Sequence, residues 1–88
     1  MNIEVLFFGK LRELATRQRV IPMMDGARLA DLIEYLAKEY GVDFHQEVDH
    51  VERLRILING REYDLLGSME AQLKDGDTVV FLPLIAGG

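Results

Sequence analysis

Residues 79–88 read VVFLPLIAGG, and the expected architecture is built around this segment. Its first half is β-branched and aromatic, which predicts a strand buried on at least one face. Pro83 has no N–H to donate to a neighbouring strand and is expected to end or edge this one. Ala86, Gly87 and Gly88 carry no side chain beyond one methyl group, so we expect residues 85–88 to extend as a flexible tail. The working atom of such a tail would be the α-carboxylate of Gly88.

The totals predict one small domain, covering residues 1–84, ahead of that tail. The formal net charge is −5, from 15 acidic and 10 basic residues, which argues against nucleic acid and anionic membranes and allows a basic protein partner. No apolar run approaches the ~18 residues of a membrane span. The first residues lack the features of a signal peptide. The absence of cysteine excludes disulfides and a thiol catalyst. We therefore expect a cytoplasmic protein.

Two strands are expected before the main helix. Residues 2–8 alternate in the manner of a strand. Its core face is expected to hold Ile3, Val5 and Phe7. Residues 17–24 predict a second strand, antiparallel to the first and at an edge of the sheet, where Pro22 is tolerated. Arg17 and Arg19 would lie on one exposed face of it.

The main helix is expected at residues 27–40, closed by Gly41. Its apolar positions recur at intervals of three and four and are Leu29, Leu32, Ile33, Leu36 and Tyr40. Arg28 occupies the place of the usual cap residue, and Asp25 is expected to substitute for it. Residues 42–52 are predicted as a loop with a helical turn, because Phe44, Val48 and Val51 are spaced like a short helix.

Three further strands complete the prediction. Residues 54–58 form the third, the dipeptide 59–60 (Asn-Gly) marks a hairpin, and residues 61–63 return as a short fourth strand. Residues 66–73 predict a short 3₁₀ or helical turn, and residues 78–83 are the last strand. The economical architecture is α+β, a mixed five-stranded sheet packed on one main helix. The first and last strands would be adjacent and parallel at its centre.

Strand alternation also predicts a surface. If the core faces are assigned as above, the outward positions of three neighbouring strands are apolar too. They form one patch near the root of the tail, consisting of Leu6, Phe8, Leu57, Val80 and Leu82. Exposed apolar patches mark partner surfaces, so we expect one here. The alternatives are that a loop or a second copy covers the patch, or that the strand phase is slipped by one residue.

The ordered motifs of the chain carry a family resemblance. They are Val5-Leu6-Phe7-Phe8, Leu11-Arg12-Glu13-Leu14, Leu57-Ile58-Asn59-Gly60, Leu73-Lys74-Asp75-Gly76-Asp77, Phe81-Leu82-Pro83 and Gly87-Gly88. Together they span essentially the whole chain, and it resembles the ubiquitin-like β-grasp sulfur carriers, most closely the small subunits of molybdopterin synthase. Two departures are Pro83-Leu84, where the family often has Pro-Pro, and Arg28, where it usually has Thr or Ser.

The resemblance implies a reaction cycle. An adenylating, ubiquitin-activating-like enzyme would use ATP and magnesium to form an acyl-adenylate at Gly88, and a sulfur donor would convert it to a thiocarboxylate. The loaded tail would then enter the large subunit of molybdopterin synthase and give its sulfur to the pterin precursor. Ala86 and Gly87 would thread the narrow channel to that site, since they present almost no side chain. The chain itself would bind no cofactor and have no turnover alone.

Other functions stay open. The chain is also compatible with a ubiquitin-like modifier joined to lysines through Gly88, with a thiamine-pathway sulfur carrier, and with a non-catalytic interaction domain. Thiamine-pathway carriers are typically shorter and lack the extended region 42–53. No metal site is expected, because the spacing of five between His45 and His50 places them off one helical face.

Overall fold

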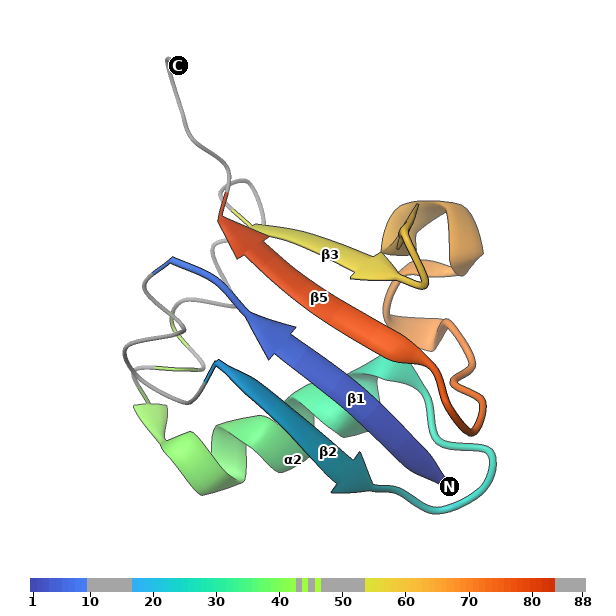
Figure 1. Cartoon of the computed structure of the whole chain (residues 1–88), viewed down its shortest axis with the longest axis horizontal. Helices are drawn as coiled ribbons and strands as arrows, with labels where there is room; N and C mark the ends of the chain where they lie inside the picture. The colour runs from blue at the N-terminus through green and yellow to red at the C-terminus, as the bar shows by residue number, and fades with distance from the viewer. Residues whose placement is uncertain (10–16, 43, 45, 47–53, 84–88) are drawn as a thin grey trace.

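The computed structural model describes residues 1–9, 17–42, 44, 46 and 54–83. Five strands form one sheet, which α2 crosses on one face (Figure 1). In chain order the elements are β1 (Asn2–Phe7), β2 (Gln18–Pro22), α2 (Leu29–Tyr40), β3 (Leu54–Ile58), β4 (Arg61–Glu62), the 3₁₀ helices η2 (Tyr63–Leu66) and η3 (Ser68–Glu70), and β5 (Thr78–Pro83). The expected mixed sheet on one main helix is therefore observed.

The order of strands across the sheet is β2-β1-β5-β3-β4. The central pair, β1 and β5, runs parallel, and the other three neighbouring pairs are antiparallel. These two strands come from opposite ends of the chain and carry the most continuous apolar sequence, which suits the most covered positions of a sheet. The prediction of a parallel centre is confirmed, as is the edge position of the second strand, which is predicted at residues 17–24 and spans Gln18–Pro22.

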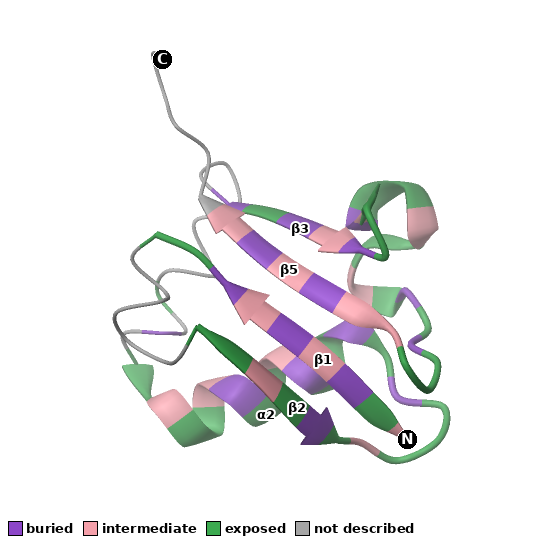
Figure 2. Ribbon diagram, viewed as in Figure 1, coloured by how far each residue is buried: buried purple, intermediate pink, exposed green. Residues whose placement is uncertain are grey.

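The core lies between the sheet and α2. Alternate residues of β1 and β5 are buried and half-buried, so the two strands appear striped in Figure 2. The helix side of β1 holds Ile3, Val5 and Phe7, as the alternation predicts. From α2 the buried residues are Leu29, Leu32 and Leu36. The strand phase is thus confirmed, and a slip by one residue is excluded.

The ends of α2 differ partly from expectation. The helix begins at Leu29 and not at residue 27, and Arg28 precedes it in an extended conformation. The backbone N–H of Arg28 donates to Oδ2 of Asp31 at 2.9 Å, so the cap comes from within the first turn. The prediction that Asp25 substitutes is wrong, because its carboxylate lies 3.6 Å from the N-terminal ammonium. At the other end, Gly41 has φ +92° and its N–H donates to the carbonyl of Ala37.

The predicted hairpin connects β3 to β4. Asn59 and Gly60 have φ values of 52° and 82°, the left-handed pair required by a two-residue type I′ turn. The Asn59 side chain also accepts the N–H of Thr78 at 2.9 Å and donates to Asp77 at 2.8 Å. This turn therefore joins the end of β3 to the start of β5. The returning strand is shorter than predicted, because Tyr63 already belongs to η2.

The segment after Gly41 is described only in part. Val42, Phe44 and Gln46 are helical, consistent with the predicted helical turn, and the Phe44 side chain is fully buried. Val48 and Val51 lie outside the described residues, as does the connection between β1 and β2 at residues 10–16.

Candidate functional site

The predicted reacting residues, Ala86, Gly87 and Gly88, lie outside the residues that the structure describes. The structure does place the strand that leads to them. β5 pairs with β1 as far as Phe81 opposite Phe7, and with β3 as far as Pro83 opposite Leu54. Because β1 and β5 are parallel, β5 ends in the middle of the sheet at the same edge as β1. The chain therefore leaves the sheet from its central strand before residue 84.

The predicted patch residues that lie on strands share one face of the sheet, the face opposite α2. Register places Val80 between Leu6 on β1 and Leu57 on β3, so these three form a row across adjacent strands. The patch residues on strands are half-buried, and Phe8, which follows β1, is 40% exposed. Phe8 is held beside β5 by donating its N–H to the carbonyl of Phe81 at 3.1 Å. The register thus brings Leu6, Val80 and Leu57 together, and Phe8 and Leu82 come two residues after Leu6 and Val80 in the chain. The use of these five residues as a partner surface stays a prediction.

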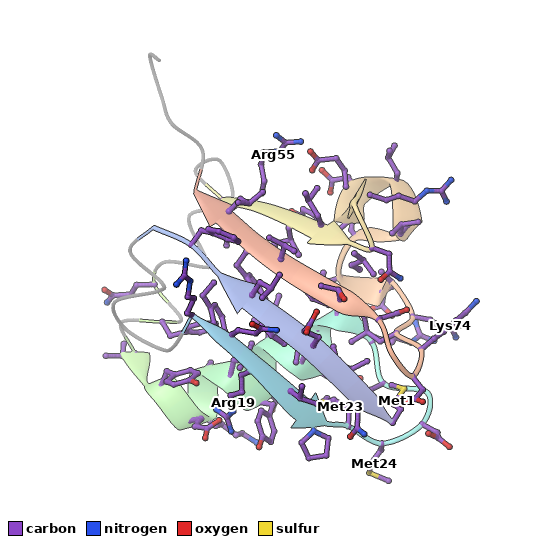
Figure 3. All side chains as sticks on the ribbon, viewed as in Figure 1. Met1, Arg19, Met23, Met24, Arg55 and Lys74 are labelled. Carbon is purple, nitrogen blue, oxygen red and sulfur yellow. The ribbon has the colours of Figure 1, made fainter. Side chains whose placement is uncertain are left out.

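Polar side chains border this patch on both sides. Arg55 of β3 lies opposite Leu82 of β5, and the Nε of Arg55 donates to Oε1 of Glu62 at 2.7 Å. Figure 3 shows Arg55 beside the start of β3 and the end of β5. On the other side, the carboxylate of Glu4 accepts from Gln18 at 2.8 Å and from Thr78 at 3.2 Å. An apolar centre inside a polar rim is the anatomy of a protein–protein interface.

Aromatic rings support the same end of the sheet from the helix side. Phe7 and Phe81 stack with ring centroids 5.3 Å apart, and Phe44 meets both edge-on, at 5.9 and 6.3 Å. Tyr40, the last residue of α2, adds its ring 6.2 Å from Phe7. The role of Phe44 could not be read from helical spacing, because what it contacts is decided by distant strands. The ends of β1 and β5 therefore rest on a packed base.

Arg19 is placed differently from the prediction. Its side chain lies on the helix side of β2, only 28% exposed, and does not share an open face with Arg17. Nη1 of Arg19 donates to Oε2 of Glu39 at 2.5 Å and to the hydroxyl of Tyr40 at 2.9 Å. These hydrogen bonds, with Glu39 first, raise the pKa of the guanidinium above its ordinary value. Arg19 thus ties the edge strand to α2 and stays charged.

Among the described residues, Tyr63 is the other titratable group whose pKa the structure shifts. It is the first residue of η2, and its side chain is buried against the core. Burial, with smaller contributions from Asp64 and Glu62, raises its pKa above the ordinary value of 10.0. The hydroxyl is therefore kept protonated, which suits a core residue and supplies no general base.

Metal binding has no support in the part of the chain that the structure describes. Within it, no group of three or more His, Asp or Glu side chains is arranged to hold an ion. His45 and His50 lie outside the described residues. None of the described helices is both long and apolar enough to cross a membrane.

Comparison with known proteins agrees with this geometry. The model of the ThiS family matches residues 5–88. The molybdopterin synthase sulfur carrier subunit of Chlamydomonas reinhardtii is 34% identical, with all of both chains covered. The small archaeal modifier protein 3 of Haloferax volcanii is 32% identical, again over all of both chains.

A solved structure is similar as well. The solution structure of the Haloferax volcanii protein HVO 2177 superposes with a TM-score of 0.81 at 31% identity, over 100% of this chain and 87% of that one. The expected ubiquitin-like β-grasp fold and the resemblance to sulfur carriers are confirmed. The relatives include both a sulfur carrier and a modifier, so similarity alone does not separate these two roles.

Proposed function

The chain belongs to the ThiS family, and on that basis we propose that it is a sulfur carrier whose working group is the α-carboxylate of Gly88. The observation that carries this proposal is the extent of the family match, which runs from Val5 to Gly88 and so includes the terminal Gly87-Gly88. The position of β5 supports it, since a central strand anchored on both sides leads toward residues 84–88.

The proposed chemistry starts from a carboxylate, which is a poor electrophile. Its oxygen attacks the α-phosphorus of ATP, pyrophosphate leaves, and the acyl-adenylate of Gly88 forms. Sulfur delivered by a donor at the oxidation level of hydrosulfide (HS⁻) then attacks the Gly88 carbonyl carbon. The C–O bond to AMP breaks, AMP leaves with the bonding electron pair, and a thiocarboxylate remains at Gly88. ATP and magnesium belong to the activating enzyme in this proposal. The chain has no cysteine to attack the adenylate internally.

The patch of Leu6, Phe8, Leu57, Val80 and Leu82 is the proposed docking surface for these partners. It borders the end of β5, so a protein seated on it would receive the tail. The aromatic base beneath Phe81 holds that end of the sheet while the partner binds. The activating enzyme and the acceptor of sulfur would use the patch in turn, which fits a carrier that has no turnover alone.

The proposed destination of the sulfur is molybdopterin, with the chain acting in the cytoplasm as the small subunit of a molybdopterin synthase. The relative from Chlamydomonas reinhardtii supports this choice, because it is named a molybdopterin synthase sulfur carrier subunit and the match covers its whole length. A second candidate is conjugation to lysines through Gly88. This second candidate is supported by the similarity to small archaeal modifier protein 3, whose 32% identity is close to the 34% of the sulfur carrier subunit. Both candidates share the acyl-adenylate and differ in the nucleophile that follows.

Intact-mass analysis of the protein from its native cells tests the proposal. We expect a species in which sulfur replaces one oxygen at Gly88, and loss of molybdoenzyme activity in cells whose only copy lacks Gly88. Leu65→Ala, at a residue 80% exposed outside the patch, is the matched control and should retain both. A ladder of conjugates without any thiocarboxylate would favour the modifier. An unaltered C-terminus under all conditions would refute both candidates.

A further inference from the structure

Among the described residues, no strand pairs with the backbone groups on the outer edge of β2. Arg17 accepts the N–H of Phe7 at 3.0 Å, and the N–H of Met23 donates to Met1 at 2.7 Å, so the odd-numbered residues of β2 face β1. Because antiparallel pairing alternates, the N–H and C=O groups of Gln18 and Val20 face the opposite way. No strand lies beyond β2 in the described part of the chain. The Val20 side chain is 57% exposed on this edge strand.

A hollow of about 560 Å³ opens where β2 ends. Pro22, Met23 and Met24 line it from the strand and the following turn, and Asp31 and Tyr35 line it from α2. Met24 is 85% exposed and Tyr35 is 38% exposed. Figure 3 shows Met23 and Met24 at this end of β2. Large apolar side chains left this open beside a hollow are typical of a binding groove.

One row of helix residues extends the hollow into a groove along β2. Asp31, Tyr35 and Glu39 follow one another at intervals of four and so share a face of α2. The first two line the hollow, and Glu39 is held by Arg19 of β2. The row therefore runs beside the edge strand over most of its length, bringing an open ladder, an apolar hollow and carboxylates together.

We propose that this groove binds an extended peptide segment of a partner protein, apolar and followed by basic residues. Its backbone pairs with Gln18 and Val20 as an added strand. One of its apolar side chains enters the hollow between Met24 and Tyr35. Its basic residues meet Asp31 and Asp25, whose side chain is 97% exposed.

Charge selects this occupant over a second copy of the chain. The net charge is −5, so two copies of the chain repel one another on approach. A basic segment is instead attracted to the carboxylates of Asp25 and Asp31 at the hollow.

The groove is independent of the proposed sulfur chemistry. Pro22 pairs with Asn2 at the amino end of β1, whereas β5 ends beside the carboxyl end of β1. Figure 1 shows the two ends of the sheet well separated. A partner in the groove therefore leaves the apolar patch and the end of β5 open, so two proteins can be held at once. Loading of Gly88 is expected to be unchanged by variants of the groove.

Nuclear magnetic resonance titration of the whole chain tests the proposal. The probe is the capped peptide Ser-Val-Ile-Val-Ile-Arg-Lys, and its control has Glu-Glu in place of Arg-Lys. We expect amide shifts at Gln18, Val20, Met24 and Tyr35, slower hydrogen exchange at Gln18 and Val20, and about tenfold weaker binding of the acidic peptide. Shifts confined to Leu6, Leu57 and Val80, equal binding of the two peptides, or no binding overturn the proposal. So does self-association through the same amides without peptide.

Two variants sharpen the test. Val20→Pro removes an N–H that points away from β1, so it should abolish peptide pairing while the β1–β2 ladder remains. Met24→Lys adds a positive charge at the hollow and should weaken binding of the basic peptide about tenfold. Leu65→Lys introduces the same charge elsewhere, at a residue that is 80% exposed, and should have no effect. If Val20→Pro does not fold, the contrast between Met24→Lys and Leu65→Lys decides alone, and equal affinities for those two refute the groove.

Discussion

The rings of Phe7 and Phe81 stack at 5.3 Å, with their planes 15° apart, on the two parallel strands at the centre of the sheet. One residue comes from the beginning of the chain and the other from near its end. Phe44 closes this pair from the helix side. The two strand ends that border the tail are therefore joined by a single packed cluster.

Removing one ring should cost much of the protein's stability. Phe81→Ala deletes a fully buried side chain from the cluster, and we expect the free energy of unfolding to fall by about 3–5 kcal/mol. Chemical denaturation followed by circular dichroism measures it. A fall below about 1 kcal/mol would show that the cluster is not a rigid base.

Phe8, which follows Phe7 in the chain, should matter for binding and not for stability. Phe8→Ala truncates a ring that is 40% exposed, so the free energy of unfolding should change by less than about 1 kcal/mol. Affinity for the activating enzyme should fall by about tenfold, because the ring belongs to the proposed docking patch. Isothermal titration calorimetry provides the measurement. Unchanged affinity with an intact fold would remove Phe8 from the partner surface.

The link between β2 and α2 predicts a salt-dependent contribution from Arg19. Arg19→Ala removes hydrogen bonds to Glu39 and Tyr40, and should lower the free energy of unfolding by about 1 kcal/mol, since the pair is partly exposed. The effect should shrink as salt is raised from low to high concentration. Arg61→Ala, at an exposed position of β4, is the control and should be nearly neutral. Equal effects of the two substitutions would contradict the link.

Tyr63 predicts how stability responds to alkali. Its pKa is raised above 10.0 in the folded protein, chiefly by burial, so the folded state holds this proton more tightly than the unfolded state. The contribution to stability is complete below the unfolded pKa and is lost as pH rises through the folded pKa. The free energy of unfolding should therefore fall above about pH 10, and Tyr63→Phe should remove that part of the slope. Denaturation over an alkaline series, with identical slopes for both proteins, would refute this.

Much of the fold could be predicted because its signals are local. The alternation of Ile3, Val5 and Phe7 sets which face of β1 is buried, and the Asn59-Gly60 pair dictates a hairpin of one type. The helix start was missed by two residues, since the cap is supplied by Asp31 inside the first turn. The outward patch also followed from alternation, because a strand that buries one face must present the other.

The strands, their phase, the main helix and the candidate role of Gly88 could all be inferred before folding was considered, since each depends on residues close together in the chain. The contacts between different elements could not, and the folded molecule was needed to see them. Arg19 looks like an exposed strand residue until α2 brings Glu39 and Tyr40 to it. The groove beside Met24 exists only because α2 runs along the edge of β2. Such contacts join residues far apart in sequence, and periodicity carries no information about distances of that kind.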